Sequence, residues 1–357
     1  MYKKGHALKT TSRRMKMIDF RRMSVRLGLT LIVWAVCSWL FAQRANARSL
    51  DPDIEYATLS QQVGAQLLRG EFDALESVSE QQRGQKLRFG DGRWKLTAFY
   101  EGMHPDDAPA STWSLYESQL KRWVQRSGAR SPTPHVALAS FYVSRAWRER
   151  GTGYAREVTP EGQEAFRENL DMAQNELTQS AVVSKRCPHW FNVMQEVALG
   201  QGWSTQKYDA LFKEAVSREP TYYFYYFSKA NFYQSRWYGS RAELQSFVDD
   251  SVARTYKSEG FTLYTRIYWS AEREFEGAMF APGNVDWTKM KAGFEFMNER
   301  YPNSNWNMNA FAHFACLARD KTTTSRALKA IGEQIAYGAW KSADEIEHCK
   351  RWASAVR

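Results

Sequence analysis

Apolar residues recur along most of this chain at the spacing i, i+3, i+4 and i+7, and this helical periodicity constrains the fold more than any other feature. The pattern predicts helices over residues 58–68, 115–124, 136–147, 166–182, 208–216 and 261–275. Breaks that contain glycine or proline separate them, at residues 90–92, 105–109, 131–134, 151–153, 220, 239, 282–283 and 302. Because strand signals are scarce and the breaks are short, the sequence predicts an all-α fold of antiparallel helical hairpins.

Two of these breaks resemble each other. Phe212 is followed after seven residues by Pro220, and Phe294 is followed after seven residues by Pro302. An aromatic helix is predicted after each proline. This arrangement resembles a tetratricopeptide hairpin, in which a Phe of the second helix packs inward and a Pro closes the unit.

The match to that repeat is partial. After Pro220, Tyr226, Ala230 and Tyr233 stand where the repeat has a large, a small and an aromatic residue, but Tyr208 stands where a small residue is expected. The two prolines are 82 residues apart, which is not a multiple of the repeat length. We therefore expect degenerate tetratricopeptide-like hairpins that form a solenoid or superhelix, and other α-solenoids stay open.

The first 47 residues have the composition of an export signal. Residues 27–42 carry no charge, nine Lys or Arg and one acid precede them, and the triplet Ala45-Asn46-Ala47 follows. We expect a signal peptide over residues 1–47, either cleaved or kept as an uncleaved anchor in the inner membrane. The rest of the chain would then be exported to the periplasm or cell envelope of a bacterium, and either Met1 or Met23 would be the true start.

The charge balance argues against a nucleic-acid partner. The whole chain has 49 basic and 39 acidic residues, but residues 1–47 hold ten of the basic residues and one of the acids. The remainder is nearly neutral, with 39 basic and 38 acidic residues, and so shows no basic excess for binding a nucleic acid. Contact with a membrane is expected only through the N-terminal segment, if that segment is retained.

The cysteines after residue 47 are Cys187, Cys316 and Cys349. Cys316 and Cys349 are 33 residues apart, about one helical hairpin, so the same position on successive repeats would bring them within disulfide distance. We take this pair as the candidate disulfide, with two buried free thiols as the alternative. Histidines near the cysteines do not have the paired spacing of a structural zinc site, and we predict no metal.

No stretch carries a recognisable catalytic or cofactor motif. The sequence has no glycine-rich phosphate loop, no H-E-x-x-H and no G-x-S-x-G. We therefore predict no catalytic residue and no cofactor.

The candidate binding residues lie near glycine loops. Trp147, Arg148, Arg150 and Tyr154 surround the loop at residues 151–153, where arginines can pair with a carboxylate. The alternative is an ordinary helix end, with Arg near the negative pole and Gly as the cap.

Two further aromatic residues are candidates. Trp237 lies in a similar Arg-Trp-Tyr-Gly stretch. Tyr226 belongs to the run of six aromatic residues at 222–227, which places rings on every face of a helix. The run indicates either core packing between hairpins or an aromatic-lined concave groove.

Several segments, taken together and in order, resemble a family of bacterial proteins known only by a domain of unknown function, the one numbered four-zero-three-four. The segments are residues 88–96 with 99–100, 146–154, 187–190, 236–239, 312–320 and 349–353. The resemblance covers roughly residues 87–352. It implies a helical, tetratricopeptide-like chain and no known activity.

These observations predict three parts: the signal peptide at 1–47, an N-terminal helical segment at 48–105, and a tetratricopeptide-like repeat domain at 106–357. The expected function is a non-catalytic scaffold that binds another envelope protein or a peptide, because the repeat architecture lacks catalytic motifs. The alternative is a protein that binds peptidoglycan or another carbohydrate, with or without enzymatic activity. Twelve tryptophans after residue 47 motivate that alternative, since sugars stack on exposed aromatic rings.

Overall fold

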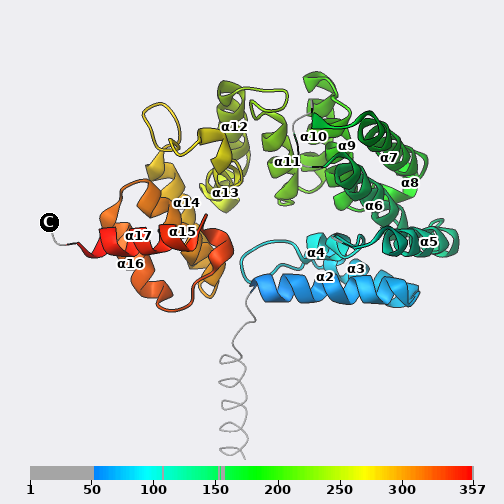
Figure 1. Cartoon of the computed structure of the whole chain (residues 1–357), viewed down its shortest axis with the longest axis horizontal. Helices are drawn as coiled ribbons and strands as arrows, with labels where there is room; N and C mark the ends of the chain where they lie inside the picture. The colour runs from blue at the N-terminus through cyan, green and yellow to red at the C-terminus, as the bar shows by residue number, and fades with distance from the viewer. Residues whose placement is uncertain (1–51, 107, 152, 154–156, 356–357) are drawn as a thin grey trace, which may run out of the picture. The chain divides into compact units, whose positions relative to one another are not determined.

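The computed structural model describes residues 52–106, 108–151, 153 and 157–355 (Figure 1). Within these residues there is no β-strand, only an isolated antiparallel bridge between Arg88 and Trp94, so the predicted all-α class is confirmed. None of the helices in these ranges has the length and apolar composition needed to cross a membrane. The predicted signal peptide at 1–47 and the candidate residue Tyr154 lie outside the described residues.

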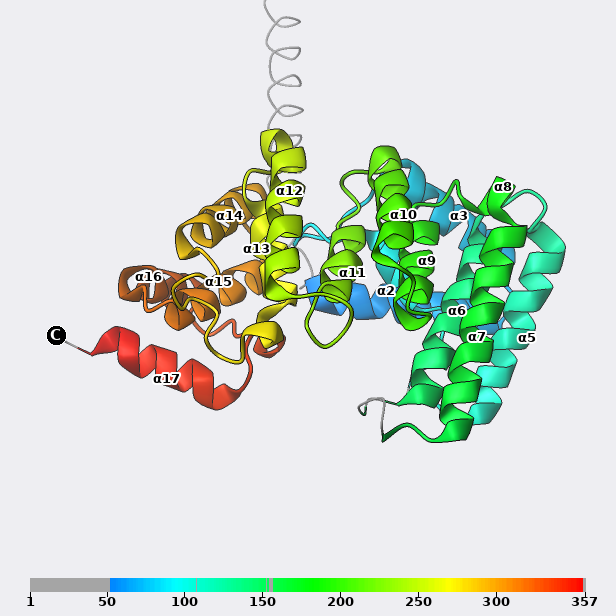
Figure 2. The same ribbon diagram turned by 90° about the horizontal axis from the view of Figure 1, so that it is seen from above.

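The helices follow one another with short connections. They are α2 (Pro52–Leu68), α3 (Phe72–Gly84), α4 (Lys95–Glu101), α5 (Ala110–Ser127), α6 (Thr133–Arg150), α7 (Pro160–Gln179), α8 (Ala181–Ser184), α9 (His189–Gly200), α10 (Thr205–Arg218), α11 (Phe224–Phe232), α12 (Arg241–Glu259), α13 (Thr262–Ser270), α14 (Trp287–Arg300), α15 (Asn305–Leu317), α16 (Lys321–Ile331) and α17 (Ala343–Ser354). Two 3₁₀ turns, η2 (Glu272–Phe275) and η3 (Tyr337–Ala339), complete the set. Consecutive helices pack on each other, and Figure 2 shows α5, α6 and α7 side by side.

Local chemistry explains where the helices begin and end. Ser or Thr side chains accept a backbone N–H at the start of α7, α10, α12, α15 and α17, and Asp side chains do so at the start of α14 and α16. The helix expected over 166–182 is broken after Gln179. There the Ser180 hydroxyl donates to the carbonyl of Glu176 (2.6 Å), a local bond that competes with helix continuation. The helix expected over 261–275 likewise ends at Ser270 and continues as η2.

The aromatic run at 222–227 lies mainly in the core. Tyr222, Tyr225 and Tyr226 are fully buried, and the rings of Phe212 and Tyr226 meet edge to face at 5.4 Å. The Tyr226 hydroxyl donates to the carbonyl of Pro220 (3.0 Å), which satisfies its polar end inside the protein. Tyr226 was a candidate binding residue of an aromatic-lined concave groove. The structure corrects that prediction, because its ring and hydroxyl are both used in packing within the α10–α11 hairpin.

A disulfide joins α15 to α17. It links Cys316 and Cys349, whose Cα atoms are 5.9 Å apart. On the same helix as Cys316, the buried His313 lies between the carboxylates of Glu272 and Glu345, each 3.3 Å from a ring nitrogen. Covalent and ionic contacts therefore hold the last helix against α15. Within the described residues, Cys187 is a free and buried cysteine.

The loop between α3 and α4 is held from several distant elements. The backbone oxygen of Asp91 accepts hydrogen bonds from Arg266 of α13 (2.6 Å) and Asn307 of α15 (3.3 Å). The indole of Trp94 donates to the backbone oxygen of Thr221, just before α11 (2.9 Å). These bonds span more than 120 residues of sequence. They seat the N-terminal helices against the later hairpins, within the single compact unit formed by Leu50–Arg357.

Gly92 in this loop leaves no room for a side chain. Its φ is +92°, and a Cβ atom there would lie 2.7 Å from the Tyr301 ring. We expect Gly92→Ala to lower the free energy of unfolding by about 2–4 kcal/mol, from backbone strain plus overpacking. Gly283→Ala is the control, since its φ is +85° with open space around it, and it should lose only about 1 kcal/mol. Urea denaturation measures both, and equal losses would contradict the close contact at Gly92.

The disulfide gives a second prediction. Closing the 33-residue separation between Cys316 and Cys349 should stabilise the fold by about 3–4 kcal/mol through the unfolded state. The double variant Cys316→Ser/Cys349→Ser should therefore have a lower melting temperature than the native protein. Adding dithiothreitol should bring the native protein down to the variant's value and leave the variant unchanged. A reductant that lowers both equally would argue against the bond.

Candidate functional site

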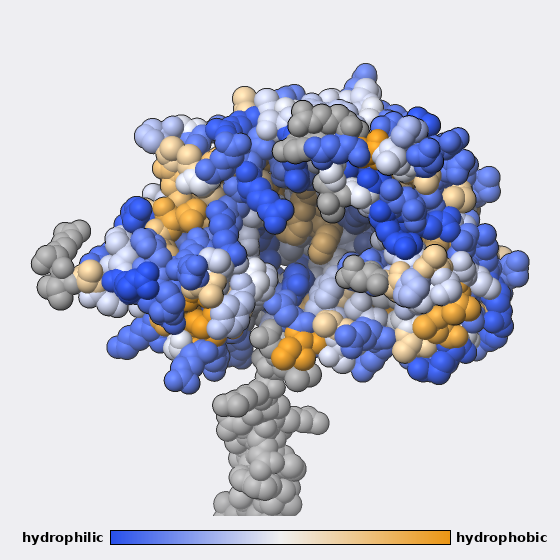
Figure 3. Space-filling view, viewed as in Figure 1, coloured by the Kyte–Doolittle hydropathy of each residue, from blue (hydrophilic) through white to orange (hydrophobic). Residues whose placement is uncertain are grey.

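A cavity of about 540 Å³ lies among α2, α4, α5, α6, α9 and α11, and we call it the Glu196 cavity. In Figure 3 the viewed face is hollowed between α11 and the N-terminal helices below it. Aromatic rings line part of the wall: Tyr56, Tyr100, Trp113, Trp147 and Phe224. Ionisable side chains line another part: Glu101, His104, Asp106, Arg148, His189 and Glu196. Uncharged residues complete the lining: Thr97, Ser140, Val143, Ser144 and Asn192.

Helical spacing explains why these side chains meet. The lining residues recur at i, i+3, i+4 and i+7 on α4 with the turn after it (97, 100, 101, 104) and on α6 (140, 143, 144, 147), and at i, i+3 and i+7 on α9 (189, 192, 196). Residues at these intervals lie on one face of a helix. Each of the three helices therefore turns one mixed polar and apolar face toward the same space.

Glu196 is a carboxyl group in a poorly solvated position. Its Oε1 accepts a hydrogen bond from the Asn192 amide (2.8 Å). Burial, followed by the negative charge of Glu101, raises the pKa of Glu196 to about 7, although His104 and Asn192 oppose the rise. Near neutral pH this group is therefore present both as an acid and as a carboxylate.

His104 and Asp106, on the turn after α4, form an ion pair in the lining of the cavity. Nδ1 of His104 lies 3.0 Å from Oδ1 of Asp106. Burial opposes the charge on His104, but the bond to Asp106 and the charges of Glu101 and Glu196 raise its pKa overall. The same bond lowers the pKa of Asp106. The cavity thus holds two carboxyl groups whose pKa is raised by burial, Glu196 and Glu101, and one whose pKa is lowered, Asp106.

The buried wall behind the cavity keeps His189 neutral. Its ring stacks on Tyr100 at 4.3 Å, and its Nδ1 shares a hydrogen bond with the Tyr222 hydroxyl (2.7 Å). Burial and the nearby charge of His104 lower the pKa of His189 to about 3. Tyr100 also shares a hydrogen bond with the thiol of Cys187 (3.1 Å). His189 is therefore a polar, uncharged part of the wall.

Trp113 has an unused hydrogen-bond donor. Its side chain is 3% exposed and lines the cavity, and its indole N–H makes no hydrogen bond within the described part of the chain. The Arg148 guanidinium lies over the same ring, 5.0 Å from its centroid. A buried N–H without a partner is unusual in a folded protein and is stabilised when an acceptor reaches it.

One group of side chains in the described ranges has donor atoms close enough for a shared metal ion. The ligand atoms of Glu101, His104 and Asp106 lie within 4.8 Å of one another. However, His104 and Asp106 already satisfy each other, and both carboxylates are exposed to solvent. The ion pair accounts for the approach of His104 to Asp106 without a metal.

The structure places the predicted binding residues in different environments. Trp147 and Arg148 line the Glu196 cavity. Arg150 instead folds back onto its own loop, where it donates to the carbonyls of Gly151 (3.3 Å) and Gly153 (3.2 Å). Trp237 packs edge to face on Trp147 at 5.7 Å, outside the set that lines the cavity. Residues 147–153 therefore contain both a helix end, at Arg150, and part of the cavity wall, at Trp147 and Arg148.

Sequence reasoning missed most of the ionisable residues of the cavity. Glu101, His104, Asp106 and Glu196 belong to no motif, and two elements distant in the sequence bring them together. Thr97, Tyr100, Glu101 and His104 recur at helical spacing, and this was a usable signal. The spacing places hydroxyl and ionisable groups on one face of a short helix whose other residues are mostly apolar.

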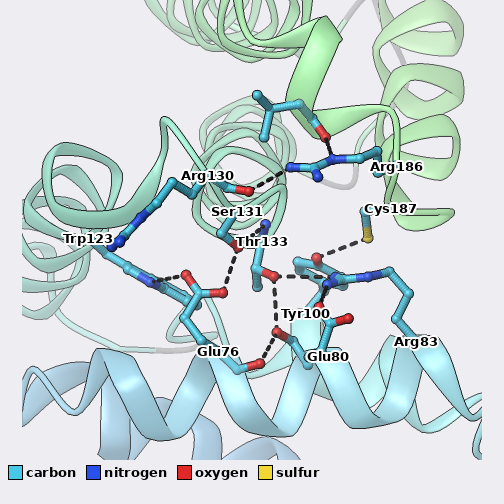
Figure 4. Close-up of polar contacts among 12 residues, drawn as sticks. Glu76, Glu80, Arg83, Tyr100, Trp123, Arg130, Ser131, Thr133, Arg186 and Cys187 are labelled. Atoms are coloured by element: carbon cyan, nitrogen blue, oxygen red, sulfur yellow. Dashed lines mark hydrogen bonds and ion pairs between the residues drawn. The ribbon is translucent and has the colours of Figure 1, made fainter.

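A second cavity, of about 530 Å³, lies between α3 and the loops before α6 and α9, and Figure 4 shows its polar network. Glu76 accepts bonds from the Trp123 indole (2.9 Å) and the Ser131 hydroxyl (2.5 Å), and Arg186 donates to the carbonyl of Arg130 (2.6 Å). These bonds join α3 to α5 and to the loop before α6, and join that loop to the loop before α9. We interpret this network as structural.

Comparisons of the chain with protein-family models, with curated proteins and with solved structures find no match.

The raised pKa of Glu196 predicts a pH-dependent stability difference. Between pH 4.5, the ordinary value, and about 7, the folded state binds this proton more tightly than the unfolded state does. Stability of the native protein should therefore fall, relative to Glu196→Gln, as the pH rises through this window, and the difference should level off above it. Melting temperatures from pH 4 to 8 measure the effect. The exposed Glu168→Gln is the control, and a Glu196→Gln difference as flat as that of the control would contradict the prediction.

Proposed function

We propose that this protein binds a carbohydrate in the Glu196 cavity. The observation that carries the proposal is the combination of aromatic rings with hydrogen-bonding groups in the lining of one cavity. A sugar ring presents C–H groups that pack on aromatic faces and hydroxyl groups that bond to carboxylates, amides and indole N–H groups. The unused N–H of Trp113 supplies a donor for one such hydroxyl oxygen.

The size and charge of the cavity support the same class of ligand. A volume of about 540 Å³ is in the range of small-molecule sites and suits one or two sugar rings. The lining combines the acidic groups Glu101, Asp106 and Glu196 with Arg148 and with His104, whose pKa is raised, so the cavity does not select strongly for an anion. A neutral ligand with many hydroxyl groups fits this balance.

The scaffold for another envelope protein or a peptide is the competing proposal. It requires an aromatic groove that a partner can reach. Tyr226 is fully buried and Trp237 is partly buried against Trp147, so neither offers an open stacking face. The carbohydrate proposal needs only the residues that do line the cavity.

The repeat class and location that we propose are those expected from the sequence: degenerate tetratricopeptide-like hairpins in an exported, periplasmic or envelope protein. Two hairpins, α10–α11 and α14–α15, support the repeat class. Phe212 contacts Tyr226 of the next helix, and the equivalent Phe294 contacts Phe311 of the next helix at 5.2 Å. The leader composition supports the location.

Binding is tested by isothermal titration with chitohexaose, soluble muropeptides and cellohexaose. At least one should bind, and Trp113→Phe should weaken that binding by roughly tenfold, because the variant loses the unpaired N–H together with the five-membered part of the indole ring. Trp287→Phe, outside the cavity, should bind like the native protein. Failure of all three sugars to bind at millimolar concentration, or native affinity in Trp113→Phe, would overturn the proposal. Enrichment of one envelope protein by a protein that binds no sugar would favour the scaffold.

A further inference from the structure

Two carboxyl groups of the Glu196 cavity stand in opposite chemical environments. Glu196 lies on α9 with one amide donor, from Asn192, and with like charge nearby at Glu101. Asp106 lies on the loop after α4, with its Oδ1 on the imidazole of His104. The first environment favours a protonated carboxyl group and the second favours a carboxylate.

We propose that the cavity also cleaves the carbohydrate it binds, with Glu196 as the general acid and Asp106 as the general base of glycosidic-bond hydrolysis. This inference rests on the proposed function, since it requires the sugar to lie between the two groups. Acid and base roles fall to paired carboxyl groups of this kind when one cavity holds them in different environments.

The reaction is balanced with water as the second reactant. Glu196 gives its proton to the glycosidic oxygen as the bond from that oxygen to the anomeric carbon breaks, and the electron pair stays on the oxygen. A water molecule attacks the anomeric carbon and gives a proton to Asp106. The products are two shorter sugars, and exchange with solvent returns the proton from Asp106 and restores that of Glu196.

Other groups that face the pair have supporting roles. The bond from His104 lowers the pKa of Asp106 and so keeps Asp106 ionised. The negative charges of Glu101 and Glu196 in turn raise the pKa of His104. Burial keeps His189 neutral, so it adds no positive charge that would favour ionisation of Glu196. Arg148 lies over the Trp113 ring at the wall and is placed to meet a ligand hydroxyl. His104 is a positioning residue, since it acts through Asp106.

The test combines binding and turnover on the same variants of the full chain. Chitohexaose and soluble muropeptides are the probes, titration calorimetry gives affinity, and a reducing-end assay gives turnover from pH 4 to 8. Glu196→Gln and Asp106→Asn should bind the probe within about threefold of the native affinity and should lose roughly 10²–10⁴-fold in turnover. Glu168→Gln should change neither. Turnover of the native protein should fall on the alkaline side as Glu196 loses its proton.

Each outcome decides something different. Native protein that binds a probe and releases no reducing ends at any pH overturns the catalytic inference and leaves the binding function intact. Native protein that binds neither probe overturns the inference together with the carbohydrate function for these sugars. Turnover that survives in Glu196→Gln overturns the role of Glu196, and turnover that survives in Asp106→Asn overturns the role of Asp106. Melting curves on both variants separate a chemical loss from a loss of folding.

Discussion

The buried backbone oxygen of Asp91 is the point on which the arrangement of this protein depends. It accepts from Arg266 and Asn307, which lie on helices more than 170 residues further along the chain. A buried carbonyl must find donors, and those donors must come to it with fixed geometry. The loop that carries Asp91 also leads directly into α4. The position of α4, and with it one wall of the Glu196 cavity, is therefore set by contacts made far from the cavity itself.

The electrostatics of the cavity follow from this placement. An open helical repeat exposes its concave side to water, where a glutamate titrates near its ordinary value. Here α4 lies against α9 through the stacked rings of Tyr100 and His189, and it brings Glu101 close to Glu196. Both burial and like charge then favour the protonated form of Glu196. The unusual acid arises because two separate stretches of chain meet, and neither helix would produce it alone.

Helical periodicity was sufficient to predict the fold class and most helices, because an amphipathic face records which side of a segment is buried. It does not record which other segment covers that face. The aromatic run containing Tyr226 shows the limit: its composition fitted both a core and a groove, and the complete burial of the Tyr226 ring against Phe212 decides between them. The cavity residues were missed for the same reason. Glu196 and His104 look like ordinary solvated residues until the packing of α4 on α9 removes their water.

Residues 147–153 contain both a helix end and part of a cavity wall, and this bears on how such a chain acquires a site. The backbone N–H of Gly151 caps the end of α6 by donating to the carbonyls of Trp147 and Arg148, and the Arg150 side chain binds the loop that follows. Trp147 and Arg148, on that last turn, then reach the cavity. A helix end that is needed for folding thus also contributes two side chains to the cavity wall. In a repeat protein, where helix ends are numerous, a cavity can form where an added element such as α4 lies beside the side chains that such an end presents.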